Sequence, residues 1–241
     1  MVHAHHPCLC LVYRPGCPKA FTDEPETWGL RIIANIHSYS GVDMIPAVEA
    51  LKKLKEGNRR FVAGKSAELH RTHKLVDNQE PFAVVLGCSD SRVPPEILFD
   101  QGVGDMFVIR IAGNIVTPLE QGSVEFAAIK FGPRLVVVLG HSCCGAVTAT
   151  VETLSTGGDV SGLSEGMQTI VEHIGESVDL DRGENTDAVI ERTIEANIKN
   201  SVNQLRTGSA VLRDLIANHG VVVVGAMYSL DTGVVEFIDC P

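Results

Sequence analysis

The chain is poor in positive charge and lacks any long apolar run. Its 20 Lys and Arg residues are outnumbered by 30 Asp and Glu residues, which gives a formal net charge of −10 at pH 7. A chain this acidic is a poor candidate for binding nucleic acid or an anionic membrane surface. No uncharged apolar stretch approaches the roughly 20 residues that a membrane span needs. We therefore expect a soluble protein without a membrane span that acts on a small molecule.

The sequence also lacks a secretory leader and a disulfide framework. Its N-terminus shows no basic segment followed by an apolar core and a small-residue cleavage site. The seven cysteines are odd in number and widely spread, whereas secreted disulfide frameworks are usually shorter, denser and even in count. A reducing, cytoplasmic location is the better prediction, and there clustered cysteines serve as ligands or nucleophiles rather than as bridges.

Two regions differ in composition. Apolar residues make up 44% of the 241 residues and charged residues 21%, which are ordinary values for a globular domain. Residues 1–43 show no clear periodicity, and we predict a poorly ordered N-terminal extension there, followed by one catalytic domain over 44–241. The alternative for the extension is an accessory metal-binding tail that uses His3, His5, His6, Cys8 and Cys10.

From residue 46 onward, apolar periodicity predicts alternating helices and strands. The expected strands are 82–86, 106–111, 135–139 and 221–224, followed by a hairpin through 227–230 and 234–238 with a turn at 231–233. The expected helices are 46–63, 121–131, 145–154, 165–176, 187–205 and 210–218. Continuous apolar strands that alternate with helices favour an α/β fold, with a parallel-core β-sheet flanked by helices and a C-terminal hairpin.

Two polar clusters interrupt this pattern where apolar strands are expected to end in glycine. Cys88-Ser89-Asp90-Ser91-Arg92 follows Gly87, and His141-Ser142-Cys143-Cys144 follows Gly140. Reacting groups gather beyond the carboxyl ends of parallel strands, so the clusters converge if the two strands are neighbours. Thiolate and imidazole suit Zn²⁺, and three protein ligands leave the open position of a catalytic site. The candidate ligands are Cys88, His141 and either Cys143 or Cys144, because spacing does not separate adjacent cysteines.

Asp90 and Arg92 follow Cys88 closely. A carboxylate beside a metal can ligate it or accept a proton from bound water, and Arg92 would pair bidentately with Asp90 and keep it ionised. A zinc-bound water loses its proton near neutral pH and becomes a nucleophile. These residues predict metal-assisted hydration or hydrolysis of a small electrophile. The alternatives are buried structural cysteines, a structural ion pair, and a redox pair of Cys143 and Cys144.

The motifs resemble those of the β-class carbonic anhydrases. The resemblance runs from about Ala47 to the closing hairpin and is carried by Gly87–Glu96 (GCSDSRVPPE), Gly104–Val116 (GDMFVIRIAGNIV), Gly122–Phe126 (GSVEF) and Gly140–Ala146 (GHSCCGA). It implies reversible hydration of CO₂ to bicarbonate and a proton, with one Zn²⁺ per subunit and a zinc-bound hydroxide as nucleophile. Matched by position, the zinc ligands are Cys88, His141 and Cys144, and Cys143 fills a variable place.

The resemblance also implies roles beside the metal. Asp90 and Arg92 match the catalytic dyad, in which the aspartate, held by the arginine, orients the zinc-bound hydroxide. In the inactive arrangement of some members this pair breaks and the aspartate ligates zinc. Members with an inhibitory bicarbonate site tend to carry Trp where this chain has Val85. We therefore expect a plant-like, open site without strong bicarbonate inhibition.

A substrate pocket and self-association follow from the same resemblance. Gln79 resembles a glutamine whose amide hydrogen-bonds the substrate, and Phe107 matches an apolar pocket wall. Phe126 also matches a pocket position, although plant-type members carry Tyr there. The family builds its active sites at a dimer interface, with an N-terminal helical arm around the partner that corresponds to helix 46–63. A dimer, or a tetramer made from dimers, is implied.

Two other functions compete with CO₂ hydration. Relatives with the same zinc core hydrolyse carbonyl sulfide or carbon disulfide, through changes in the access route. A non-catalytic zinc-binding protein or a carboxysome-type structural protein would need a lost ligand or dyad residue, or large added domains. The chain retains all five of Cys88, Asp90, Arg92, His141 and Cys144, which favours the enzyme.

Overall fold

A five-stranded sheet forms the centre of the described part of the chain. The computed structural model describes residues 44–66, 79–180 and 185–238, all within the unit Gly41–Pro241, and the extension predicted at 1–43 lies outside them. The strand order is β2-β1-β3-β4-β5, and only β5 runs antiparallel to its neighbour. The strands are β1 (Ala83–Cys88), β2 (Met106–Ile111), β3 (Leu135–His141), β4 (Val222–Tyr228) and β5 (Val235–Ile238). The predicted α/β class and the C-terminal hairpin are confirmed.

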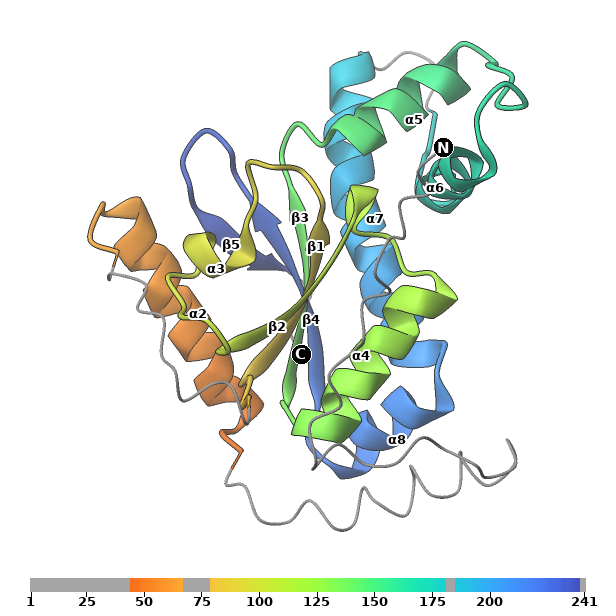
Figure 1. The fold of residues 1–241 in the computed structure, drawn as a ribbon. Helices are drawn as coiled ribbons and strands as arrows, with labels where there is room; N and C mark the ends of the chain where they lie inside the picture. The colour runs from red at the N-terminus through yellow and green to blue at the C-terminus, as the bar shows by residue number, and fades with distance from the viewer. Residues whose placement is uncertain (1–43, 67–78, 181–184, 239–241) are drawn as a thin grey trace, which may run out of the picture. The chain divides into compact units, whose positions relative to one another are not determined.

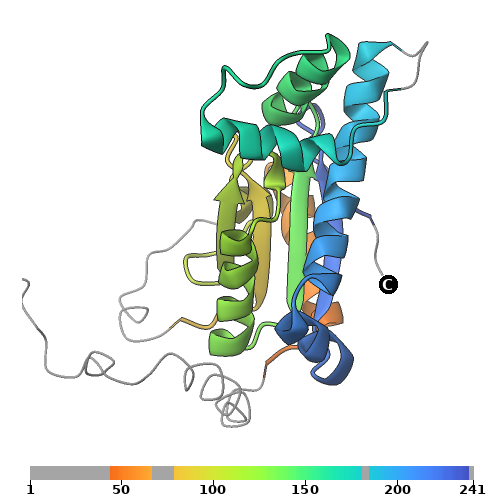
Figure 2. The same ribbon diagram turned by 90° about the vertical axis from the view of Figure 1, so that its right-hand side faces the viewer.

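Helices cover both faces of this sheet (Figures 1 and 2). Helix α2 (Ala47–Val62) lies on one face, and α4 (Pro118–Phe131), α7 (Thr186–Thr207) and α8 (Ala210–Asn218) lie on the other. Helices α5 (Gly145–Ser155) and α6 (Glu165–Gly175) lie beyond the carboxyl ends of the parallel strands. None of the described helices is long and apolar enough to cross a membrane.

The central strands β1 and β3 are buried along their whole length, as their continuous apolar sequences require. Both extend further than predicted. Gly87 and Gly140 lie inside the strands rather than at their ends, so Cys88 and His141 are the last strand residues. At Gly140 the reason is packing from α7, because a Cβ there would lie 2.5 Å from Cδ1 of Ile198. Gly140 therefore lets α7 pack closely against β3, and the strand continues past it to His141.

Local capping explains another difference between prediction and structure. The helix predicted over 121–131 begins at Pro118, because Thr117 and Glu120 form a reciprocal capping box around its first turn. Proline suits the first helical position, where its missing N–H is not needed. Two short elements were not predicted: α3 (Pro95–Leu98) and the 3₁₀ turn η2 (Ala112–Asn114), which are too short to show periodicity.

The buried side chain of Asn58 joins helix α2 to other parts of the same chain by hydrogen bonds. The Asn58 amide donates to the carbonyls of Leu98 and Gly233, at 3.1 and 3.0 Å. Its oxygen accepts from the N–H of Val235 at 2.9 Å. The N-terminal helix is therefore part of the described domain, joined to the closing hairpin by a fully satisfied polar side chain.

Candidate metal centre

Three predicted ligands meet at the carboxyl ends of two neighbouring strands. Strands β1 and β3 are paired directly, with Gly87 opposite Leu139, so the predicted convergence of the two clusters is confirmed. Cys88 ends β1, His141 ends β3, and Cys144 directly precedes the first residue of α5. Their potential ligand atoms all lie within 4.8 Å of one another, and all three side chains are buried. We call these three residues the metal group.

The neighbouring cysteine is placed differently. Cys143 adopts a φ of 54°, in the left-handed region, and its thiol is exposed. It does not belong to the metal group, whereas Cys144 does. Spacing alone left these two cysteines undistinguished, because a left-handed residue between His141 and Cys144 cannot be inferred from it.

His141 presents one ring nitrogen to the centre of the metal group. Its Nδ1 lies 2.9 Å from the carbonyl oxygen of Ser142 and donates to it, so Nε2 carries the lone pair. Nε2 is buried and has no hydrogen-bond partner among the described residues. Ser142 is itself fixed, since its N–H donates to the carbonyl of Tyr228 and its hydroxyl accepts from the N–H of Leu230, both at 2.9 Å. A buried unpaired nitrogen beside two sulfurs is what a zinc ion would satisfy.

The two cysteines of the metal group are hydrogen-bonded to each other through their sulfurs. Their sulfurs are 3.9 Å apart. The hydrogen bond from Cys144 lowers the pKa of Cys88 to about 4, against the opposing effect of burial. The same bond, followed by burial, raises the pKa of the Cys144 thiol above its usual range. The N–H of Gly113, 3.4 Å from the Cys88 sulfur, also favours the thiolate. This donor set, a thiolate, a thiol that can release its proton and an imidazole nitrogen, fits Zn²⁺.

Asp90 and Arg92 form a bidentate pair beside the metal group. Arg92 Nε donates to Asp90 Oδ1 at 2.9 Å and Nη2 donates to Oδ2 at 2.7 Å, while the Arg92 backbone N–H also reaches Oδ1 at 2.9 Å. These bonds hold the pKa of the Asp90 carboxyl well below its usual range. Arg92 Nη2 further donates to the carbonyl of Cys143 at 3.3 Å, which links the two polar clusters. In this structure Asp90 is paired with Arg92 and is not part of the metal group.

Other contacts around the metal group were not predicted. Arg110, on β2, donates from Nε to the carbonyl of Cys88 at 3.0 Å and from Nη2 to the carbonyl of Asp90 at 2.6 Å. Asn197, buried on α7, donates to the carbonyl of Gly113 at 2.7 Å and so helps to position the residue whose N–H faces Cys88. The sequence signal for Arg110 is a lone charge in an otherwise apolar strand. Its observed partners are backbone carbonyls.

The predicted substrate residues lie on other elements than the metal group: Phe107 near the amino end of β2, Phe126 on α4 and Gln79 before β1. Phe107 is paired with Val84, four positions before Cys88, which is about 13 Å along the strand. Its ring centroid lies 6.3 Å from that of Phe126, whose side chain is 54% exposed. Gln79 is exposed and precedes β1. Within one chain, therefore, the structure does not bring Gln79, Phe107 and Phe126 to the metal group.

Comparison with known proteins agrees with the resemblance found in the sequence. A family model described as carbonic anhydrase matches residues 83–235. Carbonic anhydrase 2 of Mycobacterium tuberculosis is 40% identical over 190 residues, covering 77% of this chain and 90% of that protein. The carbonic anhydrase of Mycolicibacterium smegmatis is 42% identical over 193 residues, covering 78% and 92%.

Solved structures agree on the fold. The β-carbonic anhydrase CafA of Aspergillus fumigatus superposes with a TM-score of 0.58 at 27% identity, covering 69% of this chain and 79% of that one. A β-carbonic anhydrase of Sordaria macrospora, described as tetrameric, gives a TM-score of 0.58 at 21% identity, covering 89% and 98%. The family match, the relatives and the shared fold together show that this chain belongs to the β-class carbonic anhydrases.

Proposed function

We propose that this chain catalyses the reversible hydration of CO₂ to bicarbonate and a proton, with one Zn²⁺ held by Cys88, His141 and Cys144. The observation that carries the proposal is the metal group itself. Its ligand atoms lie within 4.8 Å of one another, and its buried imidazole Nε2 has no hydrogen-bond partner in the part of the chain that the structure describes. Zinc, when bound, supplies the Lewis acidity that makes a water molecule a nucleophile near neutral pH.

Asp90 is proposed to orient the attacking oxygen. Its Oδ1 already accepts two N–H groups of Arg92, whereas Oδ2 accepts only one. A carboxylate oxygen has two acceptor positions, so Oδ2 retains a free one. We assign this position to the hydrogen bond from the attacking oxygen, which directs the oxygen's lone pair toward the carbon of CO₂. Arg92 keeps Asp90 charged and fixes its plane.

We further propose that Gln79, Phe107 and Phe126 serve the metal group of a second subunit. Two features support this: the separation of about 13 Å along β1 and the 54% exposure of Phe126, a large apolar side chain. An active site at a dimer interface, as the family resemblance implies, would bring the two sets together. The Sordaria relative is described as tetrameric, which agrees with self-association.

Stopped-flow CO₂ hydration, measured at about pH 7 and pH 8.5 with the zinc content of each sample, tests the metal assignment. The adjacent cysteines provide matched variants. We expect Cys144→Ser to lose stoichiometric zinc and activity. Cys143→Ser, one residue away and outside the metal group, retains both. Equal zinc loss in the two variants would overturn the ligand assignment. A zinc-replete protein that hydrolyses carbonyl sulfide but does not hydrate CO₂ would overturn the proposed reaction.

A further inference from the structure

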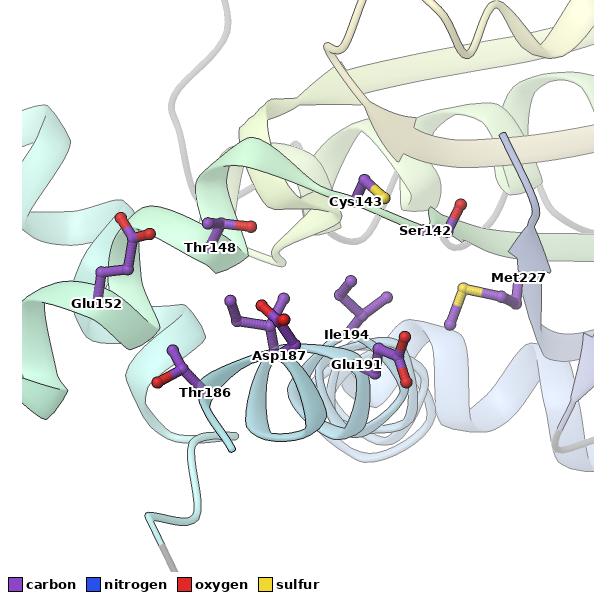
Figure 3. Close-up of a pocket in the computed structure, with 10 residues that line it drawn as sticks. Ser142, Cys143, Thr148, Glu152, Thr186, Asp187, Glu191, Ile194 and Met227 are labelled. Atoms are coloured by element: carbon purple, nitrogen blue, oxygen red, sulfur yellow. The ribbon is translucent and has the colours of Figure 1, made fainter. Parts of the chain in front are cut away.

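Helix α7 borders the metal region along one face. In its first turns, Ile194 lines a pocket of about 520 Å³ whose opposite wall includes Ser142 and Cys143 (Figure 3). Asn197 and Ser201 follow Ile194 at spacings of three and four residues, which places them on the same face of the helix. There the face is closed by packing, and each of these two residues is only 2% exposed. The buried part of α7 therefore presents two polar side chains to the elements packed against it.

Asn and Ser are costly residues at buried positions inside a helix. Their side chains favour caps and turns over helix interiors, and a buried polar group lowers stability unless it is hydrogen-bonded. The structure shows a partner for each of them. Asn197 Nδ2 donates to the carbonyl of Gly113 at 2.7 Å, and the Ser201 hydroxyl donates to the carbonyl of Asn114 at 3.0 Å. Both accepting carbonyls belong to the turn η2, which follows β2.

The backbone of η2 is left-handed at two successive residues. Gly113 has a φ of 73° and Asn114 has a φ of 44°. A Cβ at Gly113 would also lie 2.6 Å from Cδ1 of Ile174, so both the backbone conformation and the available space require glycine there. Glycine has the widest backbone freedom of any residue, and a buried carbonyl outside regular structure needs a side chain or water as its partner. The bond from Asn197 therefore restrains the most adaptable residue of the turn.

Gly113 faces the metal group through its N–H, which donates to the Cys88 sulfur at 3.4 Å. The N–H and the carbonyl of Gly113 flank a single Cα, so the bond from Asn197 to the carbonyl limits how far the N–H can turn away from Cys88. A hydrogen bond to a thiolate is charge-assisted and withdraws electron density from the sulfur. Groups that orient or hydrogen-bond a metal ligand in this way tune the affinity of the site for its metal.

We propose that Asn197 is a positioning residue for the metal centre. By holding the carbonyl of Gly113, it keeps the Gly113 N–H on the Cys88 sulfur and so sets the metal affinity and the donor strength of that sulfur. Ser201, one turn further along α7, makes the same kind of bond to the next carbonyl, one residue further from the sulfur. The inference rests on the metal site of the proposed function, but it does not rest on the reaction proposed there.

Variants of Asn197 and Ser201 in the full chain separate positioning from support of the fold. Asn197→Leu removes the donor and keeps a similar volume. We expect its zinc affinity, measured by competition with a chelator, to fall about tenfold or more. In the cobalt-substituted variant, the thiolate-to-cobalt charge-transfer absorption should move to lower energy, because the Cys88 sulfur loses its hydrogen bond. Ser201→Ala removes a comparable buried bond from the same helix, so it should lower the melting temperature without changing zinc affinity or the cobalt spectrum.

The possible outcomes distinguish this inference from the proposed function. If Asn197→Leu loses stability as Ser201→Ala does, with zinc affinity and the cobalt spectrum unchanged, Asn197 only supports the fold and the inference is overturned. Asn197→Ala, a smaller replacement that also lacks the donor, gives the same comparison if Asn197→Leu does not fold. A wild-type chain whose cobalt form shows no thiolate charge-transfer absorption would overturn the proposed metal site, and this inference with it. None of these measurements depends on CO₂ hydration.

Discussion

The two ends of strands β1 and β2 carry different parts of the expected chemistry. At the carboxyl end, Cys88 belongs to the buried metal group, beside the Asp90–Arg92 pair. At the amino end, Phe107 packs against the exposed Phe126. Cys88 ends β1, whereas Phe107 lies near the start of the neighbouring β2 and Phe126 lies on α4, so most of a strand's length separates Phe107 from Cys88. Residues that belong to one family pattern therefore need not lie together within one chain.

Metal removal should have the largest effect on activity, and its effect on local stability should be confined to the carboxyl ends of the parallel strands. We expect chelation to abolish CO₂ hydration and to lower the melting temperature, because zinc binds the folded state preferentially. Hydrogen exchange should accelerate in residues 112–114 and 141–145, which contact the metal group, and remain unchanged at the start of β2. Exchange that accelerates equally at both ends would mean that the metal stabilises the whole sheet, which contradicts the proposed separation.

Substituting Asp90 by Asn comes next in size. The side-chain amide of Asn has only one acceptor oxygen, so it cannot accept both side-chain hydrogen bonds from Arg92. We therefore expect kcat to fall about 10²- to 10⁴-fold with zinc content unchanged. The depressed pKa of Asp90 keeps its carboxylate charged at any pH above about 4. The wild-type activity should therefore not titrate with Asp90 between pH 6 and 9. Loss of zinc from the Asn variant would instead make Asp90 a determinant of metal binding.

Arg110→Ala should have a smaller effect on activity, because Arg110 positions Cys88 and Asp90. Arg110 holds the carbonyls of Cys88 and Asp90, so its loss loosens the segment that joins the ligand to the dyad. We expect zinc affinity and kcat to fall about 10- to 100-fold, as for other groups that orient metal ligands, with partial recovery in Arg110→Lys. Arg213→Ala, which removes an arginine-to-carbonyl bond on α8, is the control and should change neither quantity. An altered cobalt absorption spectrum in Arg110→Ala alone would locate the effect at the metal.

The smallest expected effect is the recovery of activity in mixed oligomers, which tests whether each active site takes residues from two subunits. Co-expression of Cys144→Ser chains, inactive alone, with Gln79→Ala chains, of reduced activity alone, should give mixed oligomers. Their activity should reach at most about half of the wild-type value, because one of the two sites then combines an intact metal group with an intact Gln79. A mixture of Cys144→Ser and His141→Ala should recover nothing, since both changes damage the same end. Failure of the first mixture to recover, with mixed oligomers isolated, would place each complete site within one chain.

Much of this arrangement could be predicted from local patterns. The continuous apolar runs before Gly87 and Gly140 predicted two buried parallel strands, and their adjacency placed Cys88 near His141. The predicted end of β3 was wrong because Gly140 serves packing against Ile198, a contact 58 residues away in the sequence. The hydrogen-bond partners of Arg110 and Asn197 could not be predicted either, because every residue has a backbone carbonyl and the sequence does not show which one a side chain reaches.

The separation of Gln79, Phe107 and Phe126 from the metal group has a similar cause. The predicted strand 106–111 already places Phe107 near its amino end, but it does not show which residue of β1 Phe107 pairs with. Phe107 falls early in β2, and the parallel register then fixes it opposite Val84, far from Cys88. Register depends on pairing between strands and could not be read from β2 alone.

The 3.9 Å separation of the Cys88 and Cys144 sulfurs has a consequence for handling the protein before metal is bound. A thiol whose pKa is lowered to about 4 is a thiolate at neutral pH, which is the form that oxidants and disulfides attack. Cys144 lies beside it as a ready resolving thiol, so oxidation would close a disulfide across the ligand set. Zinc occupying both sulfurs blocks this reaction. We therefore expect metal-free protein kept under reductant to take up zinc more completely than metal-free protein exposed to air.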